Sequence, residues 1–289
     1  MFSLATKEDI PQLKKIWTAC FGDEAAYQDL FFHNRFCPEN TVLWRENGIP
    51  VAMAHLLPYH MMDETKESHL CYYVYAVATS PEFQGKGIST KLLTYAKEIA
   101  QERGAAALSL VPAEPSLFDF YQKRGYHTEY YVKQLSVSQE EFTKVDPIRF
   151  KICTVQTLES LRNSYYGNAP YFVQWGNDAL QYILMESAYV GRECLSFCGT
   201  HPGYVFCEQQ GESLFVREIV CEKEDFPRMV AALFCRYPKS KKVRLRLKAD
   251  SVLGQGEILP FGMICDLSHT SMIEHTKQKS VPYMGLMLD

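Results

Sequence analysis

Three absences narrow the function of this 289-residue chain before any motif is considered. Its ten cysteines include no Cys-x-x-Cys pair, which removes the usual sequence signal for a zinc site or a dithiol redox centre. It has no long apolar run and no leader-like N-terminus, so neither a membrane span nor a signal peptide is predicted. It has no excess of basic residues either, and its net charge of -4 argues against a general nucleic-acid binder. The simplest interpretation of the ten cysteines is that they are free thiols in a reducing cytoplasm, with no bound metal.

Two common phosphate-binding motifs, G-x-x-x-x-G-K-S/T and G-x-G-x-x-G, are also missing. A different glycine-bearing turn follows the β-rich run of residues 71–79 and leads into an amphipathic helical pattern. We call this turn the cradle; its residues are Gln84, Gly85, Lys86, Gly87, Ile88 and Ser89. Free N–H groups and the positive end of the helix dipole would meet there, and glycine lets a ligand approach the main chain. The cradle therefore predicts a diphosphate site, and the alternative is a tight turn whose glycines serve geometry alone.

The cradle resembles the Gln/Arg-x-x-Gly-x-Gly/Ala motif of the GNAT superfamily of acetyltransferases. Gln84 and Gly87 match this motif, and Ser89 replaces the family's final Gly or Ala by another small residue. The segment 120–126, Phe-Tyr-x-x-x-Gly-Tyr, is similar to the GNAT segment whose tyrosine lies beside the coenzyme A sulfur. The resemblance spans residues 1–135, and it implies that acetyl-CoA is the co-substrate, with its pyrophosphate held by backbone amides.

Periodicity and turn signals predict the elements of this region in the GNAT order. The expected elements are a strand at residues 2–5, helices near 10–20 and 24–36, a hairpin around Asn47-Gly48, a strand over 71–79, a helix over 88–103, a strand over 105–111, a helix over 115–123 and a strand over 126–135.

A polar, charged stretch at residues 138–147 predicts a linker, so we place one domain at residues 1–137 and a second at 138–289. The second half repeats the order of the first. Its expected elements are helices over 155–166, 171–189 and 225–235, and strands over 193–198, 204–209, 214–221, 242–248, 261–267 and 283–288. The segment equivalent to the cradle, residues 221–227, has three carboxylates and no glycine, so it would repel a diphosphate. We therefore predict an α/β (α+β) chain of two tandem GNAT-like folds, each a mixed, mostly antiparallel sheet flanked by helices, the second degenerate.

The resemblance also implies roles for residues of the first domain. The backbone amide of Val77 would polarise the thioester carbonyl, and Val77 and Thr79 would hydrogen-bond the pantetheine arm. Tyr121 would give a proton to the departing thiolate, because a phenol with a pKa of about 10 can donate to it. The alternative is that Tyr121 only packs on the apolar face of its helix. Aromatic residues on the first two helices would either line the acceptor site or belong to the hydrophobic core; they are Trp17, Phe21, Phe31, Phe32 and Phe36.

The general base stays open. The tandem resembles the first two domains of the Eis-type acetyltransferases, which add a sterol-carrier-like domain and use the chain's terminal carboxylate in the active site. This chain reaches Asp289 without such a domain, and the strand 71–79 contains no acid. Glu114, after the neighbouring strand, is the first candidate for the base. His55, His60, the Asp289 carboxylate and a water relay are the alternatives.

The expected function is direct transfer of an acetyl group from acetyl-CoA to a primary amine on a small molecule or a peptide. An acetyl-CoA-binding sensor is the alternative from another class, and a tRNA-dependent aminoacyl transferase is a third. The stretch from Arg236 to Lys248 holds seven basic residues, and the four from Lys242 onward alternate with apolar ones, which predicts a strand with one solvated face. No nucleic-acid or membrane partner is expected, and a homo-oligomer is left open.

Overall fold

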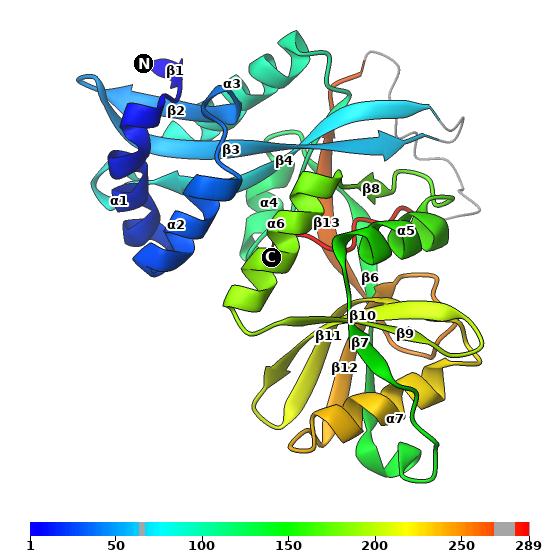
Figure 1. Ribbon diagram of the computed structural model, residues 1–289. Helices are drawn as coiled ribbons and strands as arrows, with labels where there is room; N and C mark the ends of the chain where they lie inside the picture. The colour runs from blue at the N-terminus through cyan, green and yellow to red at the C-terminus, as the bar shows by residue number, and fades with distance from the viewer. Residues whose placement is uncertain (64–66, 269–280, 289) are drawn as a thin grey trace. The chain divides into compact units, whose positions relative to one another are not determined.

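The computed structural model describes residues 1–63, 67–268 and 281–288 (Figure 1). Contacts divide these residues into two compact units. The first unit comprises residues 1–63, 67–128, 262–268 and 288, and the second comprises residues 129–261 and 281–287. The boundary expected at 137/138 falls instead between residues 128 and 129, near the start of β6 (His127–Ser138), because this strand pairs with β12 (Lys242–Lys248) of the second unit.

The first unit is a mixed, mostly antiparallel sheet with helices packed on it. Its strands are β1 (Phe2–Leu4), β2 (Thr41–Glu46), β3 (Ile49–Met62), β4 (Ser68–Thr79), β5 (Ala107–Leu110) and the end of β13 (Glu257–Asp266), adjacent in that order. Its helices are α1 (Ile10–Phe21), α2 (Ala25–Asn34), α3 (Ile88–Glu102) and α4 (Ser116–Gln122), with 3-10 turns at Lys7–Asp9, Pro38–Asn40 and Pro81–Phe83. Only β4 and β5 run parallel among these neighbours. The predicted order of elements is confirmed.

Local sequence signals account for several boundaries in this unit. Asn47 and Gly48 have φ angles of 48° and 80°, the left-handed conformation that a two-residue hairpin turn between β2 and β3 requires. Gly104, with a φ of 71°, follows the C-terminus of α3. The predicted apolar face of α3 is buried, and its residues are Leu92, Leu93, Ala96, Ile99 and Ala100.

The strands of the second unit are adjacent in the order β13-β6-β12-β11-β10-β9-β7. Besides β6, β12 and the first half of β13, its elements are β7 (Phe150–Ile152), α5 (Val155–Tyr166), β8 (Val173–Gln174), α6 (Asn177–Tyr189), β9 (Glu193–Cys198), β10 (Pro202–Gln210), β11 (Ser213–Val220) and α7 (Phe226–Arg236), with a 3-10 turn at Gln139–Phe142. As in the first unit, one neighbouring pair is parallel, here β11 and β12. No helix in the described parts of the chain has the length and apolar character needed to span a membrane.

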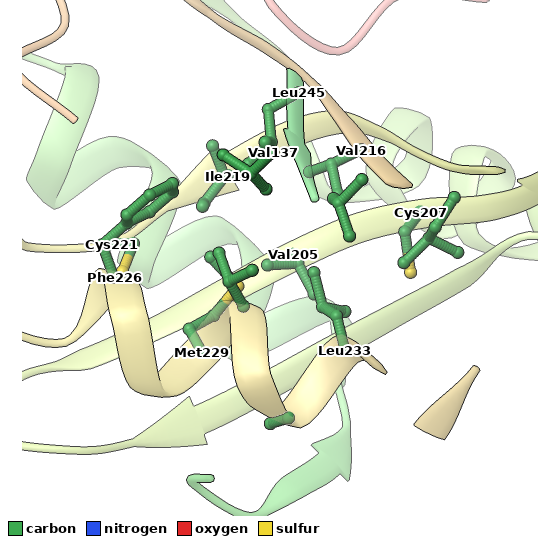
Figure 2. Packing of buried hydrophobic residues seen from close by; sticks show 14 of the residues in the cluster. Val137, Val205, Cys207, Val216, Ile219, Cys221, Phe226, Met229, Leu233 and Leu245 are labelled. Carbon is green, nitrogen blue, oxygen red and sulfur yellow. The ribbon is translucent and has the colours of Figure 1, made fainter. Parts of the chain in front are cut away.

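The core of the second unit lies between α7 and the sheet (Figure 2). Met229 and Leu233 on α7 are fully buried and face strand residues such as Val205 and Val216. Met229 and Leu233 lie on the buried face of α7, the helix expected over residues 225–235.

Three expectations for this unit are wrong. The helix expected over 171–189 begins only at Asn177, because residues 173–174 form β8 and Gly176 takes the N-cap position. Residues 283–288 do not form a strand: the side chains of Arg162, Trp175 and Glu218 bond much of their backbone. Arg246 of β12 is not on a solvated face but is only 5% exposed, since it lies over the ring of Phe261.

Candidate active site

The cradle joins β4 to α3 and is open to solvent. Gly85 and Gly87 have φ angles of 73° and 72°, and a Cβ added at either position would meet no atom within 4 Å. Gly87 is the N-cap of α3, and no side chain caps this 15-residue helix. The N–H groups of the first helical turn therefore lack a side-chain acceptor and face open space, which is the arrangement that binds an anion.

The polar side chains of the cradle brace the turn itself. Gln84 donates from Nε2 to the carbonyl oxygen of Thr79 at 2.9 Å, and Lys86 donates from Nζ to the carbonyl oxygen of Glu82 at 3.1 Å. Ile88 buries its side chain, so it can offer a ligand only its backbone N–H. Ser89 is half-buried at the start of α3. The cradle therefore offers a ligand mainly its backbone N–H groups.

A β-bulge opens the strand that leads into the cradle. Between the pairs Met53↔Ala78 and His55↔Tyr75, β4 has two residues, Ala76 and Val77, where β3 has one. Ala76 has a φ of 49°, one of the few non-glycine positive values among the described residues. Nothing in the sequence signals this bulge, because the run 71–79 has no glycine. The bulge turns the main chain at Val77, where we expected a free amide.

The parallel strands β4 and β5 separate next to this bulge. Their described pairing ends at Tyr73↔Ser109, whereas β4 continues to Thr79. The Oγ atoms of Ser109 and Thr79 are both buried with no hydrogen-bond partner among the described residues. A buried hydroxyl without a partner is costly, so both hydroxyls are candidates for hydrogen bonding to a ligand. Sequence reasoning proposed Thr79 and missed Ser109.

Tyr121 lies in the last turn of α4 and is half-buried. Its ring packs edge-on against Phe120 and Tyr126, with centroids 5.1 Å and 5.8 Å away. Burial raises the pKa of the Tyr121 phenol above its ordinary value, and the Arg124 guanidinium partly opposes this shift. The phenol therefore stays protonated at neutral pH and can act as a proton donor.

Arg124 ties this segment to the cradle helix. Its Nε and Nη2 donate to Oγ1 of Thr90 at 3.0 Å and 2.5 Å, and Nη1 donates to the carbonyl oxygen of Phe120 at 2.5 Å. Thr90 lies in the first turn of α3, immediately after the cradle. The structure therefore links the Tyr121 segment to the cradle through Arg124, a residue to which the sequence analysis gave no role.

The candidates for the general base are scattered. Glu114 is exposed in the loop before α4, where its Oε2 accepts a long hydrogen bond from Ser116 Oγ at 3.4 Å. His60 is exposed on β3, and Asp289 lies outside the described residues. His55 is only 1% exposed, so it presents no surface from which to take a proton from an incoming amine.

His55 is the polar centre of an aromatic cluster. Thr41 Oγ1 donates to the Cys37 carbonyl, so it accepts from His55 Nδ1 at 2.8 Å, and His55 Nε2 has no partner among the described residues. The rings around the imidazole are those of Trp17, Phe31, Phe32 and Phe36. Trp17, Phe31 and Phe32 are buried, so they form core, whereas Phe21 is 44% exposed.

This burial makes stability depend on pH. It lowers the pKa of His55 from 6.5 to about 3, so between these values the unfolded chain binds a proton that the folded chain does not. Stability is therefore complete above pH 6.5 and falls as the pH drops below it. We expect wild type to lose about 2 kcal/mol of unfolding free energy at pH 5 relative to pH 7 through this group. His55→Phe should lack that part of the loss in denaturant titrations at both pH values, and an equal pH dependence in both proteins would contradict the assignment.

The second unit has the same strand opening but a different helix start. The parallel ladder of β11 and β12 ends at Val216↔Leu245, while β11 continues to Val220, with a register shift against β10 near Arg217. Before α7, the carboxylate of Asp225 accepts from the backbone N–H groups of Thr200 and His201, each at 2.8 Å. A buried acid thus stands where the first unit has Gly87.

The first unit thus combines a bulged strand that parts from its parallel neighbour with an uncapped glycine turn and a helix. Residues 2–128 match the family model described as an acetyltransferase (GNAT) domain. The N-terminal unit is therefore a GNAT-type acetyltransferase domain, and the resemblance inferred from the cradle is confirmed.

Solved structures extend the likeness to the second unit. A probable N-acyltransferase of Enterococcus faecalis V583 is 14% identical with a TM-score of 0.75, covering 91% of this chain and 72% of its own. Eis1 of Mycobacterium abscessus is 12% identical with a TM-score of 0.69, covering 92% and 74%. A tandem GNAT protein from the clavulanic acid biosynthesis pathway is 12% identical with a TM-score of 0.54, covering 93% and 99%. At these sequence identities, the similarity to the solved structures shows only that the fold is shared. No curated protein sequence matches the chain significantly.

Proposed function

We propose that the first unit transfers the acetyl group of acetyl-CoA directly to a primary amine of a small molecule or peptide. The observation that best supports this is the cradle: two left-handed glycines and an uncapped helix start, with open space in front of them. Backbone N–H groups in that arrangement suit a pyrophosphate. The residues of the cradle and the unpartnered hydroxyls of Thr79 and Ser109 fit the extended shape of the co-substrate.

Each step of the transfer has a residue to support it. The main chain at Val77, displaced by the bulge, would donate to the thioester oxygen as negative charge develops on it. Amine attack forms the new C–N bond while the C–S bond breaks. Tyr121 would protonate the leaving thiolate, since its phenol stays protonated. Glu114, beside α4, remains our candidate to accept the amine proton, directly or through water.

We assign only one co-substrate site to the chain. In the second unit, Asp225 places a carboxylate at the start of α7, and no glycine with positive φ lies between β11 and α7. A pyrophosphate there would face like charge. We propose that the protein acts in the cytoplasm, because all ten cysteines are free thiols.

A binding experiment and an amine panel test this proposal. Titration calorimetry should give one acetyl-CoA per chain, and release of free coenzyme A with polyamine, aminoglycoside and peptide amines should identify the acceptor class. Tight binding of acetyl-CoA without turnover on any amine would favour a sensor. This alternative is kept because no acid lies on the bulged strand itself. Absence of binding would remove both functions.

Two glycines at opposite ends of α3 provide a matched test of the cradle. Gly87 and Gly104 have nearly equal φ angles, 72° and 71°, and neither would bring a Cβ within 4 Å of another atom. Alanine at either position should cost about 1–2 kcal/mol of stability from the left-handed backbone. Only Gly87→Ala should also weaken acetyl-CoA binding, by about tenfold, or 1.4 kcal/mol. Equal affinities in the two variants would exclude the cradle as the site.

A further inference from the structure

The second unit encloses a buried ion pair. Arg162 on α5 and Glu218 on β11 are 1% and 0% exposed, and Arg162 Nε lies 3.0 Å from Glu218 Oε1. Burying two charges is expensive, so such a pair is retained only where further hydrogen bonds satisfy it. Its remaining partners come mainly from the C-terminal segment 282–287.

The C-terminal segment is recognised through its backbone. Glu218 Oε2 accepts from the N–H of Leu286 at 2.7 Å, and Arg162 Nη2 donates to the carbonyl of Met284 at 3.2 Å. Trp175 Nε1 donates to the carbonyl of Leu286 at 2.7 Å. The N–H of Val173 donates to the carbonyl of Tyr283 at 3.0 Å. Backbone groups of Tyr283, Met284 and Leu286 are thus bound by partners on α5, on β11 and on or beside β8, as they would be in a peptide-binding groove.

The groove also discriminates between side chains at two positions of the segment. The Tyr283 hydroxyl donates to Glu218 Oε2 at 3.0 Å, and its ring stacks on Tyr166 with centroids 4.0 Å apart. Gly285 has a φ of 65°, and a Cβ there would lie 2.1 Å from Glu218 Oε2. The pattern that fits is therefore Tyr-x-Gly followed by an apolar residue.

This groove lies where β11 and β12 part. Glu218 follows the end of their ladder on β11, and Arg246 is the first residue after its end on β12. Arg246 Nε donates to the carbonyl of Arg217 on β11 at 2.9 Å, and its Nη2 lies 3.5 Å from the carbonyl of Gly285. In Figure 1 the red C-terminal trace runs beside α5. The equivalent opening of the first unit, between β4 and β5, is our proposed pantetheine site.

We propose that the strand opening of the second unit is a binding site for an extended peptide of the type Tyr-x-Gly-apolar, occupied by the chain's own segment 282–287. The second unit then acts as a receptor for a peptide and not as a second enzyme. Burial and the charge of Glu218 raise the pKa values of the Tyr204 and Tyr283 phenols, so both remain donors to this carboxylate.

The test displaces the segment 282–287 from the groove by a substitution and then adds the same segment as a separate peptide. Gly285→Ala in the full chain should displace the segment, because its Cβ would meet the Glu218 carboxylate. A fluorescent peptide with the sequence of residues 281–288 should then bind this variant, with at least tenfold weaker binding to wild type, whose groove is occupied. The same peptide with alanine in place of its glycine is the matched control and should bind neither protein. Hydrogen exchange of the 282–287 amides should accelerate at least a hundredfold in the variant.

A second variant separates docking from a local defect. Leu286→Asp also changes only the segment, and it should give the same peptide binding by placing a carboxylate near Glu218. The proposal would be overturned if the two variants bound the 281–288 peptide and its alanine control equally, or bound neither. Loss of the folded second unit in both variants would also overturn it, since the segment would then be part of the fold and not a ligand.

Discussion

Tyr121→Phe should lower kcat for acetyl transfer by about 10²- to 10³-fold while leaving the Kd for acetyl-CoA nearly unchanged. The substitution removes one hydroxyl and keeps the ring contacts with Phe120 and Tyr126. The hydroxyl has no hydrogen-bond partner in the described part of the chain, so little stability depends on it. Steady-state release of coenzyme A gives kcat, and calorimetry gives Kd.

Tyr126→Phe is the control for this prediction. Tyr126 is fully buried beside Tyr121, and its hydroxyl lacks a partner among the described residues. Removing that hydroxyl should leave kcat within about twofold and stability unchanged or slightly higher, since a buried unsatisfied group is lost. Loss of activity in Tyr126→Phe with retention in Tyr121→Phe would move the donor role to Tyr126.

Arg162→Met should destabilise the second unit by about 3–5 kcal/mol, because it leaves the Glu218 carboxylate buried without its cation. The exposed pair Lys241 and Glu212, with side chains 68% and 70% exposed, is the control. Lys241→Met should change the unfolding free energy by less than about 1 kcal/mol. Urea unfolding followed by circular dichroism measures both.

A double variant tests whether charge is the cause. Arg162→Met with Glu218→Gln leaves no unpaired buried charge, so it should be at least about 2 kcal/mol more stable than the sum of the single effects. Additive losses would mean that the pair contributes through packing alone, and that the carboxylate is not costly once its partner is gone.

Signals that are local in sequence predicted the elements well. The bounds expected for α5, β9 and β12 agree residue for residue with the structure, because alternation and helical spacing within each segment decide them. The cradle was found for the same reason, since its glycines, its helix start and the preceding strand are contiguous.

What the sequence did not predict depends on residues far apart. The bulge at Ala76 arises from the register of β4 against β3, not from an unusual residue. Residues 283–288 were expected to form a strand, but their partners are Arg162, Trp175 and Glu218 from other elements. The domain boundary differed because β6 looks like the last strand of the first fold, yet it pairs with β12.

The bridge that Arg124 makes between Thr90 and Phe120 has a kinetic consequence. A diphosphate held at the start of α3 would restrain the first turn, and through Arg124 it would restrain the turn that bears Tyr121. Donor binding would then organise the proton donor before an amine arrives, which is an ordered mechanism with acetyl-CoA first. Residues at this bridge can therefore alter turnover without contacting either substrate.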